Sequence, residues 1–203
     1  MASAPHDPAT VPLPVKILVS GGFGVGKTTF VCAVSEVEPL TTEAMLTTAS
    51  LGVDDTAYLP GKTSTTVALD FGRMTLATGL VLYLFGTPGQ GRFWFMWDDL
   101  SYGAVGAVVL ADTRRLADSF PAIDYFEDRD LPFLVAVNCF DGRASHTAAA
   151  VREALSLPIS VPLMVCDARD SGSVKSTLVQ LVEHAVELSD LAEAGAEPAR
   201  LRR

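Results

Sequence analysis

Short apolar runs alternate with amphipathic stretches along most of this chain. Four runs have the apolar composition of strands buried on both faces: Val15–Ser20, Ala104–Ala111, Phe133–Asn138 and Leu163–Cys166. Four stretches carry helical periodicity: Lys27–Glu36, Leu116–Arg129, Ser145–Leu155 and Ser173–Leu188. Because strands and helices alternate, the sequence predicts an α/β fold with a mostly parallel sheet and helices on both faces.

Two regions interrupt this alternation. Thr66–Thr75 and Leu80–Phe85 are neighbouring strand-like runs, which predict an antiparallel hairpin and bring the expected sheet to about six strands. Pro39–Ser64 is rich in Thr, Gly and Asp without clear periodicity, and it predicts a long loop with a helical turn at Glu43–Thr47. Gly86–Tyr102 predicts a second mobile loop. Loops of such length are often functional.

The connection between the first strand and the first helix carries a complete phosphate-binding signature. Residues Gly21 to Thr28 read G-G-F-G-V-G-K-T, which satisfies G-x-x-x-x-G-K-[ST] in a strand-to-helix setting. The glycines let backbone N–H groups converge on phosphate oxygens, Lys27 reaches the β- and γ-phosphates, and the Thr28 hydroxyl ligates Mg²⁺. The expected nucleotide contacts here are Gly21, Gly22, Phe23, Gly24, Val25, Gly26, Lys27, Thr28 and Thr29. The loop does not select a base, so ATPases, kinases and GTPases stay open at this point.

The residues at the end of the Phe133–Asn138 strand indicate which nucleotide base the protein selects. Asn138 to Asp141 has the spacing N-x-x-D, and a carboxylate at Asp141 would accept from the N1–H and 2-amino groups of guanine. Adenine presents an acceptor at N1, so the same carboxylate would be left buried and unpaired. A turn stabilised by Asx hydrogen bonds is the alternative interpretation of the motif.

With these motifs identified, residues 14–188 resemble the Ras superfamily of small GTPases. Leu84–Phe93, L-F-G-T-P-G-Q-G-R-F, is similar to the switch II run D-T-A-G-Q-E-R-F of Rab proteins, and Thr66–Phe71, T-V-A-L-D-F, is similar to their switch I sequence T-I-G-V-D-F. The resemblance is closest to the bacterial Ras-like GTPases of actinobacterial conservon operons, and more distant to the gliding-polarity GTPase MglA. It implies the P-loop NTPase fold of small G proteins.

The resemblance also implies roles for individual residues. Gln90 would position the attacking water, Thr66 would close over Mg²⁺ and the γ-phosphate, and the Ala168 N–H would meet the guanine O6. Because Thr63 and Thr65 lie beside Thr66, the switch I assignment could shift. The expected catalytic residues are Gln90, Lys27 and Thr66, the metal ligands are Thr28 and Thr66, and the remaining nucleotide contacts are Gly89, Asn138, Asp141 and Ala168.

Three positions depart from the family pattern. Gly86 stands where the family has the Asp that holds Mg²⁺ through water, and Asp70 is the candidate substitute, with a salt-bridged strand residue as the alternative. Phe23 fills a glycine position, where its bulk obstructs an arginine finger worth about 10³–10⁵ in rate, so we expect slow hydrolysis. Cys139 replaces the Lys of N-K-x-D, which predicts reduced guanine affinity.

The composition limits the classes of partner and the cellular compartment that we expect for this protein. A formal charge of −9 is unfavourable for nucleic acid or an anionic membrane surface, so neither a nucleic-acid partner nor a direct membrane anchor is expected. The three cysteines have no CxxC spacing and no signal peptide is recognised, which favours a cytoplasmic protein, with recruitment to the membrane by partners left open. We expect a flexible segment at residues 1–13, a GTP-binding domain at 14–188, and a helix end or tail at 189–203.

The function expected from these observations is a molecular switch that binds GTP or GDP with Mg²⁺ and hydrolyses GTP slowly. The conservon resemblance implies a roadblock-type regulator and a histidine-kinase-like membrane protein as partners. Two alternatives are kept: a nucleotide-binding scaffold without meaningful hydrolysis, and a P-loop ATPase or kinase.

Overall fold

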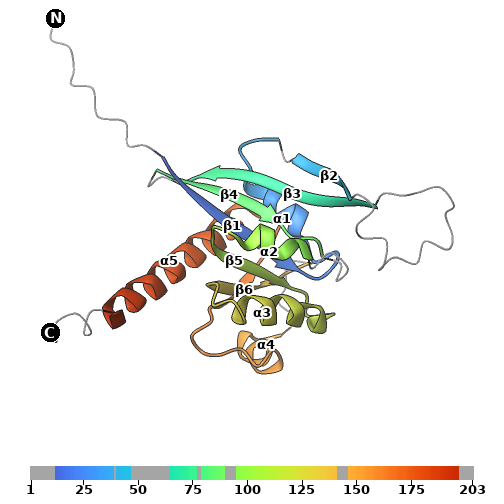
Figure 1. The fold of residues 1–203 in the computed structure, drawn as a ribbon. Coiled ribbons are helices and arrows are strands. Elements are labelled where there is room, and N and C mark those ends of the chain that lie inside the picture. The colour runs from blue at the N-terminus through green and yellow to red at the C-terminus, as the bar shows by residue number, and fades with distance from the viewer. Residues whose placement is uncertain are drawn as a thin grey trace, which may run out of the picture.

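The computed structural model describes residues 12–38, 40–46, 65–76, 79–89, 95–140 and 146–196. Within these ranges a seven-stranded sheet is covered by helices on both faces (Figure 1). The strands are β1 Leu13–Gly21, β2 Leu40–Leu46, β3 Thr65–Thr75, β4 Leu80–Gly86, β5 Ala104–Ala111, β6 Phe133–Asn138 and β7 Leu163–Cys166. The helices are α1 Lys27–Val34, α2 Phe95–Ser101, the 3-10 segment η3 Leu116–Ser119, α3 Phe120–Glu127, α4 Ala148–Ala154 and α5 Ser171–Ala196.

The strand order confirms the predicted α/β fold. It is β2-β3-β4-β1-β5-β6-β7, in which β1 pairs in parallel with β4 and β5, and β6 pairs in parallel with β5 and β7. The predicted hairpin is present, because β3 runs antiparallel to β4. The loops that follow the parallel strands therefore meet at one edge of the sheet, which is where ligands bind in open α/β folds.

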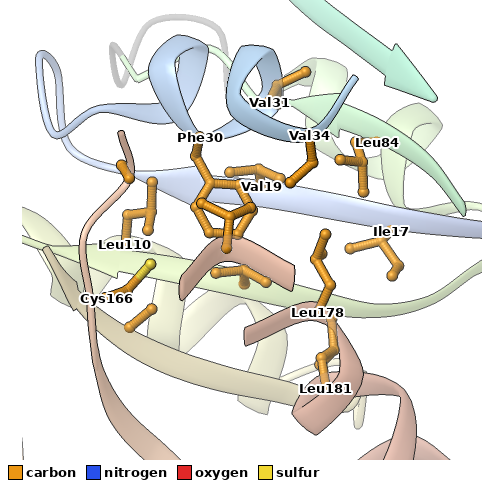
Figure 2. Close-up of a cluster of buried hydrophobic side chains, with 14 of the residues drawn as sticks. Ile17, Val19, Phe30, Val31, Val34, Leu84, Leu110, Cys166, Leu178 and Leu181 are labelled. Carbon is orange, nitrogen blue, oxygen red and sulfur yellow. The ribbon is translucent and has the colours of Figure 1, made fainter. Parts of the chain in front are cut away.

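Two buried clusters lie on the two faces of this sheet. Successive residues of β1 point to opposite faces, so that Ile17 belongs to one cluster and Leu18 to the other. The first cluster packs the sheet against α1 and α5 through Phe30 and Leu178 (Figure 2). The second packs the opposite face against α2, α3 and α4, and it includes Trp97. Packing on both faces holds the ends of β1, β4, β5 and β6 in fixed positions.

Two expectations about local structure are wrong. The segment Glu43–Thr47, expected as a helical turn within a loop, lies largely in β2, which pairs antiparallel with β3 and adds a seventh strand to the six expected. The expected loop Gly86–Tyr102 contains the helix α2, whose Trp97 is buried. In both cases long-range pairing or packing decides a conformation that the local pattern leaves weakly specified.

The last helix continues into the segment that was expected to be a helix end or tail. The predicted helix Ser173–Leu188 runs in the structure from Ser171 to Ala196. Its first half is anchored by Val174, Leu178 and Leu181, which are fully buried at helical spacing. Its second half extends away from the other helices (Figure 1). Among the described residues, no helix combines the length and the apolar character that crossing a membrane requires.

Candidate functional site

The phosphate loop lies between β1 and α1, at the edge where the parallel strands end. Gly26 has a φ of +108°, and a Cβ at this position would lie 2.7 Å from the Asn138 Nδ2. A side chain at residue 26 is therefore excluded both by the backbone conformation and by the approach of Asn138. The Phe30 N–H donates to the Gly26 carbonyl at 2.8 Å, so α1 begins directly after the loop. The free N–H groups and the positive end of a helix favour an anion at such a position.

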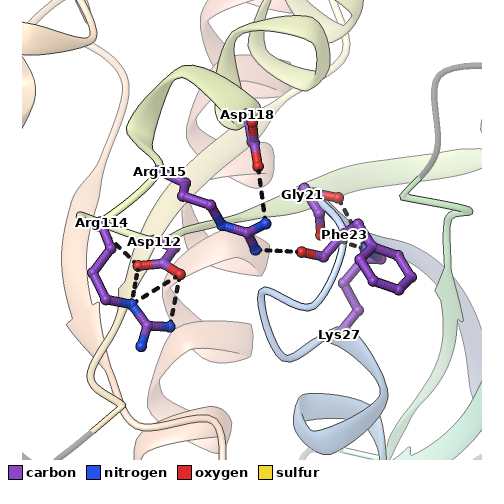
Figure 3. Close-up of polar contacts among 8 residues, drawn as sticks. Gly21, Phe23, Lys27, Asp112, Arg114, Arg115 and Asp118 are labelled. Atoms are coloured by element: carbon purple, nitrogen blue, oxygen red, sulfur yellow. Dashed lines mark hydrogen bonds and ion pairs between the residues drawn. The ribbon is translucent and has the colours of Figure 1, made fainter.

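Lys27 folds back over this loop. Its Nζ donates to the carbonyl oxygens of Gly21 and Gly22, each at 2.9 Å (Figure 3). Burial lowers the pKa of Lys27 to about 8, while the negative charge of Asp70 acts in the opposite direction. A partly desolvated ammonium group gains more from an anionic partner than one in water does. The arrangement is suited to phosphate.

Thr28 and Asp70 meet beside the loop. The Thr28 Oγ1 donates to the Asp70 Oδ2 at 2.7 Å. Asp70 is paired with Gly86 across β3 and β4, and a Cβ on Gly86 would lie 2.9 Å from the Asp70 Cβ and 3.0 Å from its Oδ2. The Asp70 carboxylate thus fills the space that a side chain at residue 86 would take. Because a hydroxyl and a carboxylate are oxygen ligands that suit Mg²⁺, these two residues fit a magnesium site.

The segment that follows β4 lies against the phosphate loop. Thr87 is buried, and its Oγ1 donates to the Ser20 Oγ at 2.9 Å. Two residues later, a Cβ on Gly89 would lie 2.5 Å from the Lys27 Nζ and 3.1 Å from the Phe23 backbone N. Gly89 therefore lies against the phosphate loop, and its missing side chain leaves room for the lysine. Its expected contact with the nucleotide stays a prediction.

Sequence reasoning missed Arg115, which holds the opposite side of the loop. Its Nη2 donates to the Phe23 carbonyl at 2.6 Å, and its Nη1 lies 3.7 Å from the Asp118 Oδ2 (Figure 3). Asp118 lies so close that a Cβ on Gly22 would be 2.6 Å from the Asp118 Cβ. The signal that could have found Arg115 is its position just after a buried strand, because such strand ends converge on the phosphate loop. The Phe23 side chain itself is 64% exposed.

The turn that carries Arg115 is fixed by a neighbouring ion pair. Asp112 is buried at the end of β5, and the Arg114 guanidinium lies 2.8 Å from its Oδ2. Hydrogen bonds from Arg114 lower the pKa of Asp112, against the opposing effect of burial. The carboxylate therefore stays ionised at neutral pH and holds the turn beside the phosphate loop.

Asn138 joins the phosphate loop and the loop after β7 to the end of β6. Its Nδ2 donates to the Val25 carbonyl at 2.9 Å, and its Oδ1 accepts from the Ala168 N–H at 3.1 Å. The side chain is buried. Asn138 therefore connects the phosphate loop, the end of β6 and the loop after β7, which makes it a positioning residue.

The backbone around Ala168 is already hydrogen-bonded within the protein. The Asp167 N–H donates to the Ser173 Oγ at 3.0 Å, the Arg169 N–H donates to the Asp167 Oδ1 at 3.0 Å, and the Ala168 N–H donates to Asn138. The expected contact from Ala168 to the guanine O6 stays a prediction. It requires that the bond to Asn138 be shared or released.

Three expected residues cannot be placed in the site. Gln90 and Asp141 lie outside the described residues, and Thr66 lies in β3 without a described side chain. Their roles in water positioning, base recognition and metal closure stay predictions. Val25 is buried, whereas Thr28 and Thr29 are exposed in the first turn of α1.

Solved structures show the same fold at low sequence identity. The cytosolic domain of the FeoB iron transporter of T. maritima, in its apo form, matches with a TM-score of 0.60 and 17% identity, over 85% of this chain and 64% of that one. The G domain of the same transporter matches with a TM-score of 0.56 and 18% identity, over 87% of this chain and 99% of that one. The FeoB G-domain of Methanococcus jannaschii matches with a TM-score of 0.55 and 14% identity, over 86% and 99%. The chain thus has the G-domain fold, and it spans about two thirds of the longer FeoB chain.

Sequence comparison places the chain in a family. No curated protein matches it significantly. A family model, described as "Conserved hypothetical ATP binding protein", matches residues 19–188, which include the phosphate loop, Asn138 and Ala168. Since this match covers most of the sequence, the chain belongs to the family of conserved hypothetical ATP binding proteins.

Proposed function

We propose that this protein is a guanine-nucleotide-binding switch that hydrolyses GTP slowly. The observation that carries nucleotide binding is the phosphate loop, where the desolvated Lys27 ammonium lies beside the paired Thr28 and Asp70, and the choice of guanine rests on the N-x-x-D spacing from Asn138 to Asp141. The FeoB domains that share the fold include a GDP form and a GMPPNP form, which supports guanine. Asn138 links this loop to the expected base-recognition segments.

Each residue of the loop has a task in such a site. The Lys27 ammonium would pair with the β- and γ-phosphates, and the backbone N–H groups at the start of α1 would donate to phosphate oxygens. Thr28 and Asp70 would hold Mg²⁺, which neutralises phosphate charge when it is bound. Gln90 would position the attacking water, and Thr66 would close over the γ-phosphate. Nucleotide-dependent ordering of these two segments would be the switch.

Adenine is the second candidate base. Two observations favour it: the description of the family names ATP, and the Ala168 N–H expected to read the guanine O6 is engaged by Asn138. Guanine remains the stronger proposal, because the N-x-x-D spacing at Asn138 supplies a carboxylate that adenine cannot pair with.

The experiment that decides the base uses the purified protein. Any nucleotide released on denaturation is identified by its base and phosphate count, and the nucleotide-free protein is then titrated with GDP and ADP by calorimetry. We expect GDP to bind at least about 100-fold more tightly, since a buried carboxylate facing adenine loses its partners. Equal affinities, or tighter binding of ADP, would establish the ATP-binding alternative.

Slow hydrolysis is part of the proposal. Arg115 is held on the Phe23 carbonyl and lies near Asp118, so it supports the loop. The exposed Phe23 ring would obstruct an arginine finger from a partner. Single-turnover GTP hydrolysis by the wild type and the Gln90→Leu variant tests catalysis. Loss of most of the rate in the variant is expected, whereas equal rates would favour the scaffold without hydrolysis.

The proposed partners follow from the resemblance to conservon GTPases. They are a roadblock-type regulator and a histidine-kinase-like membrane protein, with the switch itself in the cytoplasm and recruited to the membrane through them. Pull-down of a purified roadblock-type protein, compared between GDP-loaded and GMPPNP-loaded forms of this chain, tests the first partner. Retention in neither form would contradict the assignment.

A further inference from the structure

A large apolar groove lies at the edge of the sheet opposite the phosphate loop. It has a volume of about 990 Å³ and runs between the starts of the parallel strands and the second half of α5. Its main apolar lining residues are Leu13, Val105, Phe133, Val182, Val186 and Leu188. Leu13 at the start of β1 belongs to the groove, whereas Gly21 at the end of the same strand belongs to the phosphate loop. A partner seated here would therefore leave the nucleotide site open.

The walls of the groove carry exposed apolar side chains from two strands and a helix. Leu13 is 61% exposed, Val186 is 53% exposed, and Val105 and Leu188 are each 39% exposed. These side chains come from β1, β5 and α5 and line one continuous groove. Contiguous exposed apolar surface of this kind marks a site of protein interaction.

The charge around the groove is acidic. The carboxylates that line it are Glu127, the last residue of α3, and Asp130, which follows that helix. Glu183, Glu187 and Asp190 are exposed on α5 but are not among the residues that line the groove. Burial lowers the pKa of His184, which also lines the groove, so its imidazole is neutral at pH 7. The rim therefore repels anionic surfaces and attracts cationic groups.

We propose that this groove binds an amphipathic helix of a partner protein, with an apolar stripe seated between α5 and the strand starts and with Lys or Arg side chains on the acidic rim. Helices bind apolar grooves through side chains spaced at i, i+3, i+4 and i+7, and complementary charge sets orientation and partner choice. The acidic rim disfavours both a second copy of this acidic chain and an anionic lipid surface.

The test uses two synthetic 18-residue helical peptides with the same leucine stripe, one with lysine and one with glutamate on the polar face. Binding of each labelled peptide to the full chain is measured by fluorescence anisotropy. We expect the lysine peptide to bind at least tenfold more tightly than the glutamate peptide. Val186→Asp should weaken the lysine peptide at least tenfold, and Glu127→Lys should reduce the preference between the two peptides.

A matched control comes from the same helix. Leu191 is 69% exposed on α5 but does not line the groove, so Leu191→Asp should leave peptide binding unchanged. All three variants should have the circular dichroism spectrum of the wild type, which shows that folding is retained. They should also bind GDP as the wild type does, which shows that the nucleotide site is independent of the groove. The proposal is overturned by equal binding of the two peptides, by a Val186→Asp variant that binds like the wild type, or by a self-association of the wild type in sedimentation that Val186→Asp abolishes.

Discussion

At the scale of single residues, the carboxylate beside Thr28 is the most informative departure from the Ras pattern. In that pattern the acid stands at the end of the strand equivalent to β4, where this chain has Gly86. Here Asp70 on the neighbouring strand β3 reaches Thr28, and it fills the space over Gly86. A glycine at one position and an acid directly across the strand pair are therefore two parts of one arrangement.

Asp70 is predicted to support Mg²⁺ at the nucleotide site. Asp70→Asn should raise the Mg²⁺ concentration needed for tight GDP binding by about 10–100-fold, because loss of a residue that orients a metal commonly lowers metal affinity by that factor. Fluorescence of a labelled GDP measured across a Mg²⁺ titration reports this without catalysis. GDP binding in excess EDTA should be the same in variant and wild type.

The strand pair offers a complementary control for that prediction. Because a Cβ on Gly86 would lie 2.9 Å from the Asp70 Cβ, Gly86→Asp alone should displace Asp70 rather than add a second ligand. The double variant Asp70→Gly, Gly86→Asp relieves this clash and should recover the Mg²⁺ dependence. A Mg²⁺ titration that is unaltered in Asp70→Asn would contradict the role of Asp70.

Lys27 gives a prediction about pH. Its pKa in the protein without ligand is lowered to about 8 by burial, and a bound phosphate raises that pKa because it stabilises the charged form. At a pH above the pKa of about 8, Lys27 of the free protein is mostly neutral and must take up a proton when GDP binds. GDP affinity should therefore fall as the pH rises above about 8. Calorimetry in two buffers of different ionisation enthalpy should show proton uptake on binding near this pH; proton release or no linkage would be inconsistent with the lowered pKa.

At the scale of elements, Asn138 determines how the loops are assembled. Asn138→Ala leaves the Val25 carbonyl and the Ala168 N–H without their partner, which should reduce the free energy of unfolding by about 1–3 kcal/mol. It should also weaken GDP binding, because the phosphate loop is no longer tied to β6. Urea unfolding and calorimetry measure the two effects.

Thr147→Ala is the matched control for Asn138. The Thr147 Oγ1 accepts from the Ala150 N–H and caps α4, so its loss should cost about 1 kcal/mol of stability. GDP affinity should be unaffected in this variant, since α4 takes no part in the phosphate loop. If both variants lose GDP affinity equally, the effect of Asn138 is general destabilisation and not positioning.

The sequence was most informative where a local pattern and the tertiary fold agree. The apolar run of β6 and the spacing from Gly21 to Thr28 identified a buried strand and the phosphate loop directly. β2 was missed because its pairing with β3 depends on residues distant in the chain. Arg115 was missed for a similar reason, since only the parallel sheet brings the turn after β5 beside Phe23.

At the scale of the whole molecule, the fold separates two surfaces. The phosphate loop, Asn138 and Asp70 lie at the edge where the parallel strands end, and the apolar groove lies at the edge where they begin. The buried clusters on both faces of the sheet join the two edges into one packed unit. Such an arrangement would allow a partner to stay bound through α5 while the proposed switch segments respond to the nucleotide.

The central claim, that the site selects guanine, is tested most directly by exchanging its base specificity. Calorimetric titration of wild-type protein and of Asp141→Asn with GDP and with xanthosine diphosphate compares the two bases. The account predicts that the wild type prefers GDP and that the variant loses about 10²-fold or more in GDP affinity, because charge-assisted hydrogen bonds to the base are lost. The variant should instead gain affinity for xanthosine diphosphate, whose base has a carbonyl where guanine has its amino group. GDP affinity that is unchanged in Asp141→Asn would contradict the account.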